Sequence, residues 1–65
     1  MPRDVIFEIY RLGNVAKASA IDQDTLVEVS VVGPANADEV TLRRAALRKL
    51  ESVLARRAKL GKPAR

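Results

Sequence analysis

Apolar and polar residues alternate along three short stretches in the first half of the chain. Residues 5–12 read V-I-F-E-I-Y-R-L and are rich in β-branched and aromatic side chains. Residues 15–21 alternate alanines with polar residues, and 26–32 alternate valines with polar residues. A repeat of two places every second side chain on the same face of a strand. The pattern therefore predicts three β-strands, each with one apolar face.

Short turn-forming segments predict that these strands form hairpins. Gly13-Asn14 tolerates positive φ and suits a two-residue turn, the polar residues 22–25 suit a second loop, and Gly33-Pro34 is expected to end the third strand. The expected partners are Phe7 with Ala20, Ile9 with Ala18, Ala20 with Val27, Ala18 with Val29 and Ala16 with Val31. Each pair joins two apolar faces, which predicts an antiparallel meander in the order 1-2-3.

The second half of the chain changes to a helical repeat. Apolar residues recur every three or four positions in 37–60, as on one face of an α-helix. These residues are Leu42, Ala46, Leu47, Leu50, Val53 and Leu54. Asn36 is the expected N-cap, with Glu39 at capping-box spacing, and Gly61 with Pro63 indicates the end of the helix.

Together these elements predict an α+β protein with βββα order, in which one long C-terminal helix packs on a three-stranded sheet. We expect a single domain over 1–61 and a disordered basic tail at 62–65. Alanines in the middle strand let the helix approach closely. A helix of 24 residues is roughly 36 Å long and a strand of seven roughly 23 Å, so 55–60 should project. The expected core is Phe7, Ile9, Ala18, Val29, Leu50 and Leu54.

Charge is distributed unevenly along the 65 residues. Residues 1–38 carry three basic and six acidic side chains, a net charge of −3, whereas 39–65 carry nine basic and two acidic ones, a net charge of +7. The formal total of +4 therefore combines a mildly acidic front half with a strongly basic helix and tail. Such an asymmetry indicates either an anionic partner or a well-solvated surface.

Composition argues against most kinds of active site. The chain has no Cys and no His, which leaves no disulfide, no thiolate nucleophile and no common zinc site. Glu8 and Glu28 are expected to flank Ser19 on the outer sheet face as solvated residues, not as an acid–base pair. Asp22 and Asp24 are typical of a turn, because no further carboxylates complete a metal-binding loop. We expect no enzyme activity, no cofactor and no metal.

The sequence also bears on location. No apolar run approaches the roughly 18 residues that a membrane span requires, and the start M-P-R-D lacks the apolar segment of a signal peptide. These features predict a cytoplasmic protein that does not associate with membranes.

Two surfaces remain as candidate sites. The first is the basic side of the helix, which could bind an anion or nucleic acid and consists of Arg44, Arg48, Lys49, Arg56 and Lys59. It lacks the stacking aromatic residues that RNA-binding modules use, so a solvated face is the alternative interpretation.

The second surface is the outer face of the sheet, turned away from the helix. Its apolar residues are Ile6, Tyr10, Leu12, Val15, Ile21, Leu26 and Val32. An apolar patch of this kind is typical of a protein interface. The interface residues that we expect are Ile6, Tyr10, Leu12 and Val15.

The segments V-S-V-V-G-P-A-N-A, A-A-L-R-K-L-E-S-V-L and S-A-I-D carry a resemblance to a family of short uncharacterised proteins from alphaproteobacteria, covering roughly 7–54. The resemblance implies the βββα fold and no known activity. A serine hydroxymethyltransferase label carried by some relatives cannot apply, because 65 residues cannot hold a pyridoxal phosphate domain. The chain is also similar to the βββα part of double-stranded RNA-binding domains, but Asp38 and Glu39 replace the basic cluster expected there.

The sequence thus predicts a small, basic, non-catalytic bacterial protein that works by protein interaction. Its partner would be an unknown protein or a second copy in a homodimer. The alternative is a nucleic-acid accessory binder that uses the basic face of the helix.

Overall fold

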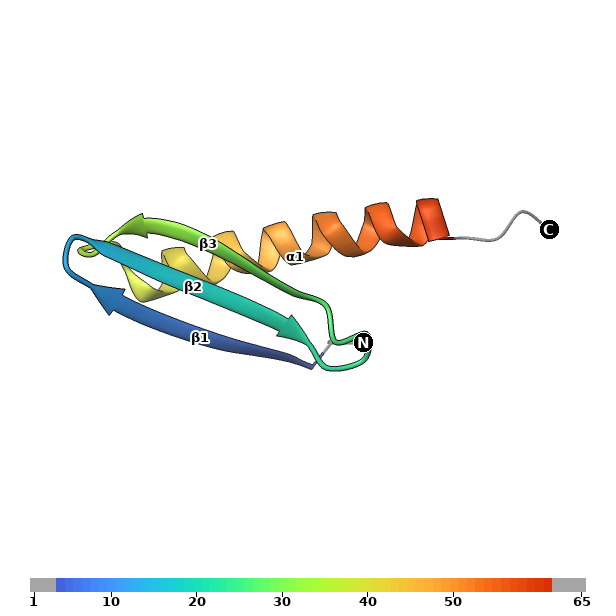
Figure 1. Cartoon of the computed structure of the whole chain (residues 1–65), viewed down its shortest axis with the longest axis horizontal. Coiled ribbons are helices and arrows are strands. Elements are labelled where there is room, and N and C mark those ends of the chain that lie inside the picture. Colours follow the sequence, from blue (N-terminus) through green and yellow to red (C-terminus); the bar gives the residue numbers. More distant parts are fainter. Residues whose placement is uncertain (1–3, 62–65) are drawn as a thin grey trace.

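A computed structural model describes residues 4–61 of the chain and confirms the βββα order (Figure 1). Strands β1 (Val5–Leu12), β2 (Val15–Asp22) and β3 (Glu28–Pro34) form an antiparallel sheet in the order β1-β2-β3. The helix α1 (Glu39–Gly61) crosses one face of this sheet. The tail predicted at 62–65 lies outside the described residues.

The first hairpin has the predicted register. Phe7 pairs with Ala20 and Ile9 with Ala18, and the pairing continues to Leu12 and Val15. Gly13 has a φ of 60°, the conformation that a II′ hairpin turn requires at its first central residue. Glycine adopts it without steric cost, which explains why the chain reverses here.

The second hairpin differs from the prediction by two residues. Ala20 pairs with Val29 and Ala18 with Val31, where Val27 and Val29 were expected. The cause is a loop at 23–26 in place of 22–25: the amide of Asp22 donates to the carbonyl of Val27 at 2.9 Å and extends β2 by one residue. A shift of two keeps every side chain on its predicted face, so the faces were right although the partners were wrong.

The third strand accordingly begins and ends later than the predicted 26–32. Gly33 and Pro34, expected to end it, belong to β3 and pair with Ala16 and Val15. A Cβ added at Gly33 would lie 3.3 Å from Cδ2 of Leu42, tighter than most contacts of this kind. The glycine therefore permits the close approach of α1 to the end of the sheet and does not mark a break in the strand.

The helix also starts two residues later than predicted. The amide of Ala37 donates to the carbonyl of Pro34 at 2.9 Å, which closes a turn that contains Asn36. Asp38 then holds the N-cap position, because its carbonyl accepts the first helical bond, from Leu42 at 2.9 Å. Asn36 is thus a turn residue, and the predicted capping box with Glu39 is wrong. Gly61 lies within α1, not beyond its end as predicted.

Small residues of the middle strand form the floor of the core, as predicted. The buried apolar residues are Ala16, Ala18, Ala20, Val29, Leu42, Ala46 and Leu50. Phe7, Ile9 and Leu54, expected in the core, are only partly buried against it. The reason is the position of α1, which packs closely on β2 and β3 but only lightly on β1.

The last part of the helix projects beyond the sheet (Figure 1), as its length predicted. Every residue of 55–60 is exposed, because this part of α1 extends past the ends of the strands and has no sheet beneath it. Among the described residues, no helix is both long enough and apolar enough to cross a membrane.

Candidate interaction surfaces

The outer face of the sheet, turned away from α1, is a regular array of side chains. Strand pairing arranges it in four rows that read across β1, β2 and β3. The rows are Ile6–Ile21–Glu28, Glu8–Ser19–Ser30, Tyr10–Lys17–Val32 and Leu12–Val15–Pro34. The charged and hydroxyl-bearing residues of β1 and β2 concentrate in the two middle rows, so the aliphatic residues of these two strands form one pair at each end, Ile6–Ile21 and Leu12–Val15.

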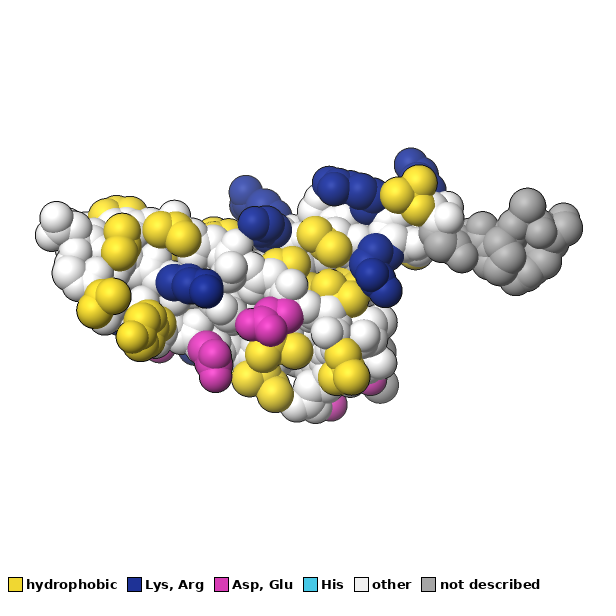
Figure 2. All heavy atoms as spheres, viewed as in Figure 1, with side chains coloured by type: hydrophobic (Ala, Val, Ile, Leu, Met, Phe, Trp, Pro, Cys, Tyr) yellow, Lys and Arg dark blue, Asp and Glu magenta, His cyan; other side chains and the backbone are white. Residues whose placement is uncertain are grey.

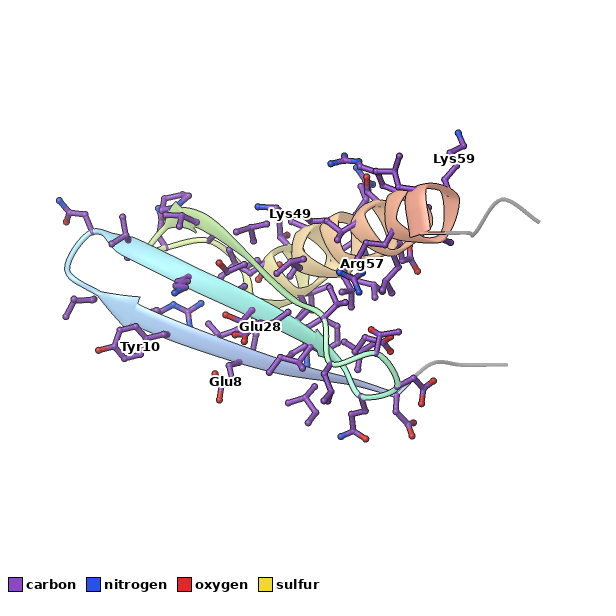
Figure 3. All side chains as sticks on the ribbon, turned by 45° about the vertical axis from the view of Figure 1, so that its right-hand side comes forward. Glu8, Tyr10, Glu28, Lys49, Arg57 and Lys59 are labelled. Atoms are coloured by element: carbon purple, nitrogen blue, oxygen red, sulfur yellow. The ribbon has the colours of Figure 1, made fainter. Side chains whose placement is uncertain are left out.

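All four residues predicted as a protein interface are exposed on this face. Tyr10 and Leu12 have 63% and 65% of their surface accessible, and Ile6 and Val15 have 44% and 48%. Figure 3 shows the side chains of Glu8 and Tyr10 on the side of the sheet away from α1. The strand alternation therefore brings the predicted residues together on one side of β1 and β2.

The shift of the second hairpin changes one predicted group on this face. Glu28 pairs with Ile21, and Ser19 pairs with Ser30, so Glu8 and Glu28 do not flank one serine as expected. Ser19 is buried at 6% accessibility in the centre of the array. The two carboxylates lie in different rows and do not form a paired acidic site.

The two edges of the sheet are protected differently. On β3, the ammonium of Lys49 donates to the carbonyl of Ser30 at 2.9 Å, and Pro34 has no amide hydrogen to offer. A lysine and a proline are two devices by which proteins keep a sheet edge from pairing with another chain. Strand β1 contains neither residue type.

Hydrogen bonds at the loops show which backbone groups of β1 face outward. The amide of Gln23 donates to the carbonyl of Asp4 at 3.1 Å, which assigns the even-numbered residues of β1 to the ladder with β2. The odd-numbered residues Val5, Phe7, Ile9 and Arg11 therefore direct their backbone N–H and C=O groups toward the open edge.

The predicted basic residues of α1 differ in their surroundings. Figure 2 shows Lys and Arg side chains gathered over α1, with a further basic side chain over the sheet, where the visible Asp and Glu side chains lie. Arg44 and Arg48 line a shallow depression with Thr41 and Ala45. Lys49 belongs to the predicted basic face, but its ammonium donates a hydrogen bond to the backbone of β3.

A hollow lies where the projecting helix passes the loop between β2 and β3. Its walls are Asp22, Asp24, Thr25, Leu54, Arg57 and Ala58. Asp22 is 1% exposed and accepts a bond of 2.8 Å from the Thr25 hydroxyl, while Leu26 has a left-handed φ of 63°. These features shape the loop, which supports the turn interpretation of the aspartates. Within residues 4–61, no group of three or more acidic, Cys or His side chains could hold a metal ion.

Sequence reasoning missed the role of Arg11. Its guanidinium donates to the carbonyls of Ala35 at 3.0 Å and Ala37 at 2.9 Å, which joins β1 to the connection between β3 and α1. The signal was present in the strand pattern, because Arg11 follows Phe7 and Ile9 on the inner face and is the only charged residue of that face in β1. Arg11 is itself exposed, and the two backbone carbonyls accept the hydrogen bonds of its guanidinium at this end of the sheet.

Comparison with known proteins gives a family and no activity. No curated protein and no solved structure matched the sequence significantly. One family model, described as "Domain of unknown function (DUF6898)", matches residues 2–57. The match includes all three strands and most of α1. The chain therefore belongs to the DUF6898 family.

Proposed function

We propose that this protein is a non-catalytic interaction module that binds a protein partner, either another protein or its own copy, through the outer face of β1 and β2. The observation that carries the proposal is the exposure of Ile6, Tyr10, Leu12 and Val15 on one face of a small sheet. Isolated exposed apolar residues are common, but Tyr10, Leu12 and Val15 are neighbours at one end of β1 and β2, and such a group marks an interface more often than a free surface.

The size of the core supports this assignment. The fully buried side chains are mostly alanines, and the largest fully buried apolar one is Leu50. A core of this kind contributes little apolar burial, which is the main source of folding free energy in a small domain. Covering Tyr10, Leu12 and their neighbours would add apolar burial that α1 does not provide.

The chemistry of the described residues favours binding over catalysis. The chain has no Cys or His, and the outer-face carboxylates of Glu8 and Glu28 lie in separate rows. A paired general acid and general base must both lie within reach of the same reacting group, and Glu8 and Glu28 are not held together in this way. The proposal accordingly assigns no catalytic residue and no cofactor.

Capture from native cells tests the proposed function. The full chain would be tagged, cross-linked briefly in its own cells and recovered with and without nuclease, as wild type and as an Ile6→Lys, Leu12→Lys double variant. Val40→Lys is the matched control, because Val40 is an exposed apolar residue of α1 at 50% accessibility. We expect a protein partner, or a cross-linked second copy, that the double variant loses and the control keeps. Recovery of the same proteins with all three chains would contradict the proposal. So would a partner that is lost only after nuclease treatment and is kept by the double variant.

A nucleic-acid accessory role is the second candidate. It is favoured by the gathering of exposed arginines on α1, including Arg44, Arg48 and Arg56, apart from the acidic residues of the sheet. If it holds, the affinity for a DNA duplex falls with salt at a log–log slope of about −0.9 for each phosphate neutralised. Arg44→Glu with Arg48→Glu should then abolish binding. A failure to bind duplex or single strands in low salt would remove this candidate.

A further inference from the structure

We infer that two copies of this chain pair antiparallel along their β1 edges and form one continuous six-stranded sheet with both helices on the same face. The inference rests on the proposed function and specifies its partner and contact. Strand β1 is an open edge whose outward backbone groups belong to Val5, Phe7, Ile9 and Arg11. It carries neither of the devices found on β3, where Lys49 and Pro34 protect the edge.

Steric access to this edge is good. The helix packs mainly over β2 and β3 and only lightly on β1, so it leaves the β1 edge largely accessible. Phe7 and Ile9 remain only partly buried on the inner face for the same reason. A strand added beside β1 would cover the exposed side of both residues and would satisfy their outward N–H and C=O groups.

The faces of the strand restrict the register of a two-fold pair. Inner residues must lie opposite inner residues, because a one-residue slip would place apolar side chains against polar ones. The two longest registers that meet this condition centre either on Glu8 or on Ile9. In the first, Glu8 lies directly opposite its own copy, and like charges at that position are destabilising. In the second, Ile9 lies opposite Ile9 and Glu8 lies opposite Tyr10 of the other copy.

The register centred on Ile9 also joins the separated apolar pairs of the outer face. It sets Ile6 of one copy opposite Leu12 of the other. The row of Ile21 and Ile6 in one copy then continues as the row of Leu12, Val15 and Pro34 in the second copy. These five side chains form a continuous apolar row across the dimer contact. The two-fold axis produces this row twice. On the inner face, Phe7 comes to lie opposite Arg11, whose aliphatic stem offers it apolar contact.

The natural absence of cysteine provides a direct test of this register. Residues 6 and 12 form a non-hydrogen-bonded pair in the proposed dimer, with Cα atoms about 4.5 Å apart, which is within the range that a disulfide spans. Two full-length single variants, Ile6→Cys and Leu12→Cys, would be mixed and oxidised mildly. The expected product is the mixed disulfide dimer, in excess over either self-linked species.

Each variant alone is the matched control. In the proposed register, the two copies of residue 6 lie six positions apart along the strand, about 20 Å, and cannot form a disulfide. Self-linked Ile6→Cys in amounts equal to the mixed product would overturn the register. A Glu8→Cys variant that forms a disulfide with its own copy would indicate the register centred on Glu8. This result would also overturn the register centred on Ile9.

Sedimentation equilibrium of the full chain completes the test. The wild type is expected to dimerise with increasing concentration, and Ile6→Lys should shift the equilibrium to monomer because each dimer contains the contact twice. Val32→Lys, on the same face at the protected edge, should dimerise like the wild type. A wild type that stays monomeric at all concentrations would overturn the homodimer. The protein partner recovered by capture from cells would then decide the proposed function separately.

Discussion

At the scale of single residues, the fold depends on positions where a small side chain or an unusual backbone angle is required. Ala16, Ala18 and Ala20 are completely buried beneath α1, and Gly33 gives Leu42 the space to pack at the end of the sheet. Leu26 holds a left-handed conformation that costs most residues about 1–2 kcal/mol. Both kinds of position yield simple stability experiments.

Ala18→Leu should destabilise the protein by about 1–3 kcal/mol, because the space between β2 and α1 has no room for three further carbon atoms. Lys17→Leu is the control: it adds an apolar side chain to the same strand but on the exposed face. Urea unfolding followed by circular dichroism measures both free energies. Equal stability of the Ala18→Leu variant and the wild type would show that the middle strand does not lie beneath the helix.

Leu26→Gly should stabilise the protein or leave it unchanged, although glycine normally weakens folded structure. Leu26 is 77% exposed, so its side chain contributes little burial, and glycine relieves the positive φ angle. Leu26→Val should be less stable than Leu26→Gly by about 1–2 kcal/mol, because a branched Cβ suits this conformation poorly. Melting temperatures that rank the valine variant above the glycine variant would refute the loop described at 23–26.

At the scale of elements, sequence reasoning recovered the type and order of all four and placed several ends incorrectly. The alternation in β1 and the Gly13 turn determined the first hairpin down to its individual pairs. The second loop was misplaced by one residue because D-Q-D-T looks like a complete polar loop. Leu26 belongs to the loop because its backbone has a positive φ angle. The amino-acid composition of the segment does not indicate that a leucine adopts this conformation.

The start of the helix was misjudged for a related reason. Asn36 and Asp38 are both good N-cap residues, and only the hydrogen bond from Ala37 to Pro34 decides between them. The candidate interface was predictable because alternation alone assigns Ile6, Tyr10 and Leu12 to one face. The contact of Lys49 with β3 depends on how α1 lies on the sheet, and that of Arg11 depends on the path of the chain between β3 and α1. A one-dimensional pattern carries no information about either.

Arg11→Lys should cost about 0.5–1.5 kcal/mol of folding free energy, because lysine cannot donate to two carbonyls with the fixed fork of a guanidinium. The two bonds join β1 to the segment before α1, so their loss should also loosen that connection. Arg43→Lys, an exposed change on the helix, is the matched control. Unfolding free energies for the two variants that differ by less than about 0.5 kcal/mol, the usual spread for a surface change, would contradict the structural role of Arg11.

At the scale of the whole molecule, the protein has a protected side and an open side. On the β3 side, the helix covers the inner face and Lys49 closes the edge. On the β1 side, the inner residues are half-buried, the outer residues are exposed, and the backbone edge carries no protection from a lysine or a proline. This asymmetry is why we expect the β1 side to be the contact surface of the molecule.

Amide hydrogen exchange measured as a function of protein concentration tests this claim most directly. In an isolated chain, the amides of Phe7 and Ile9 face solvent at the open edge and should exchange quickly. We predict that their exchange slows as concentration rises, while the outward amide of Val32 on β3 exchanges at the same rate throughout. Fast exchange of Phe7 and Ile9 at every concentration, or equal protection of Val32, would contradict association through the β1 edge.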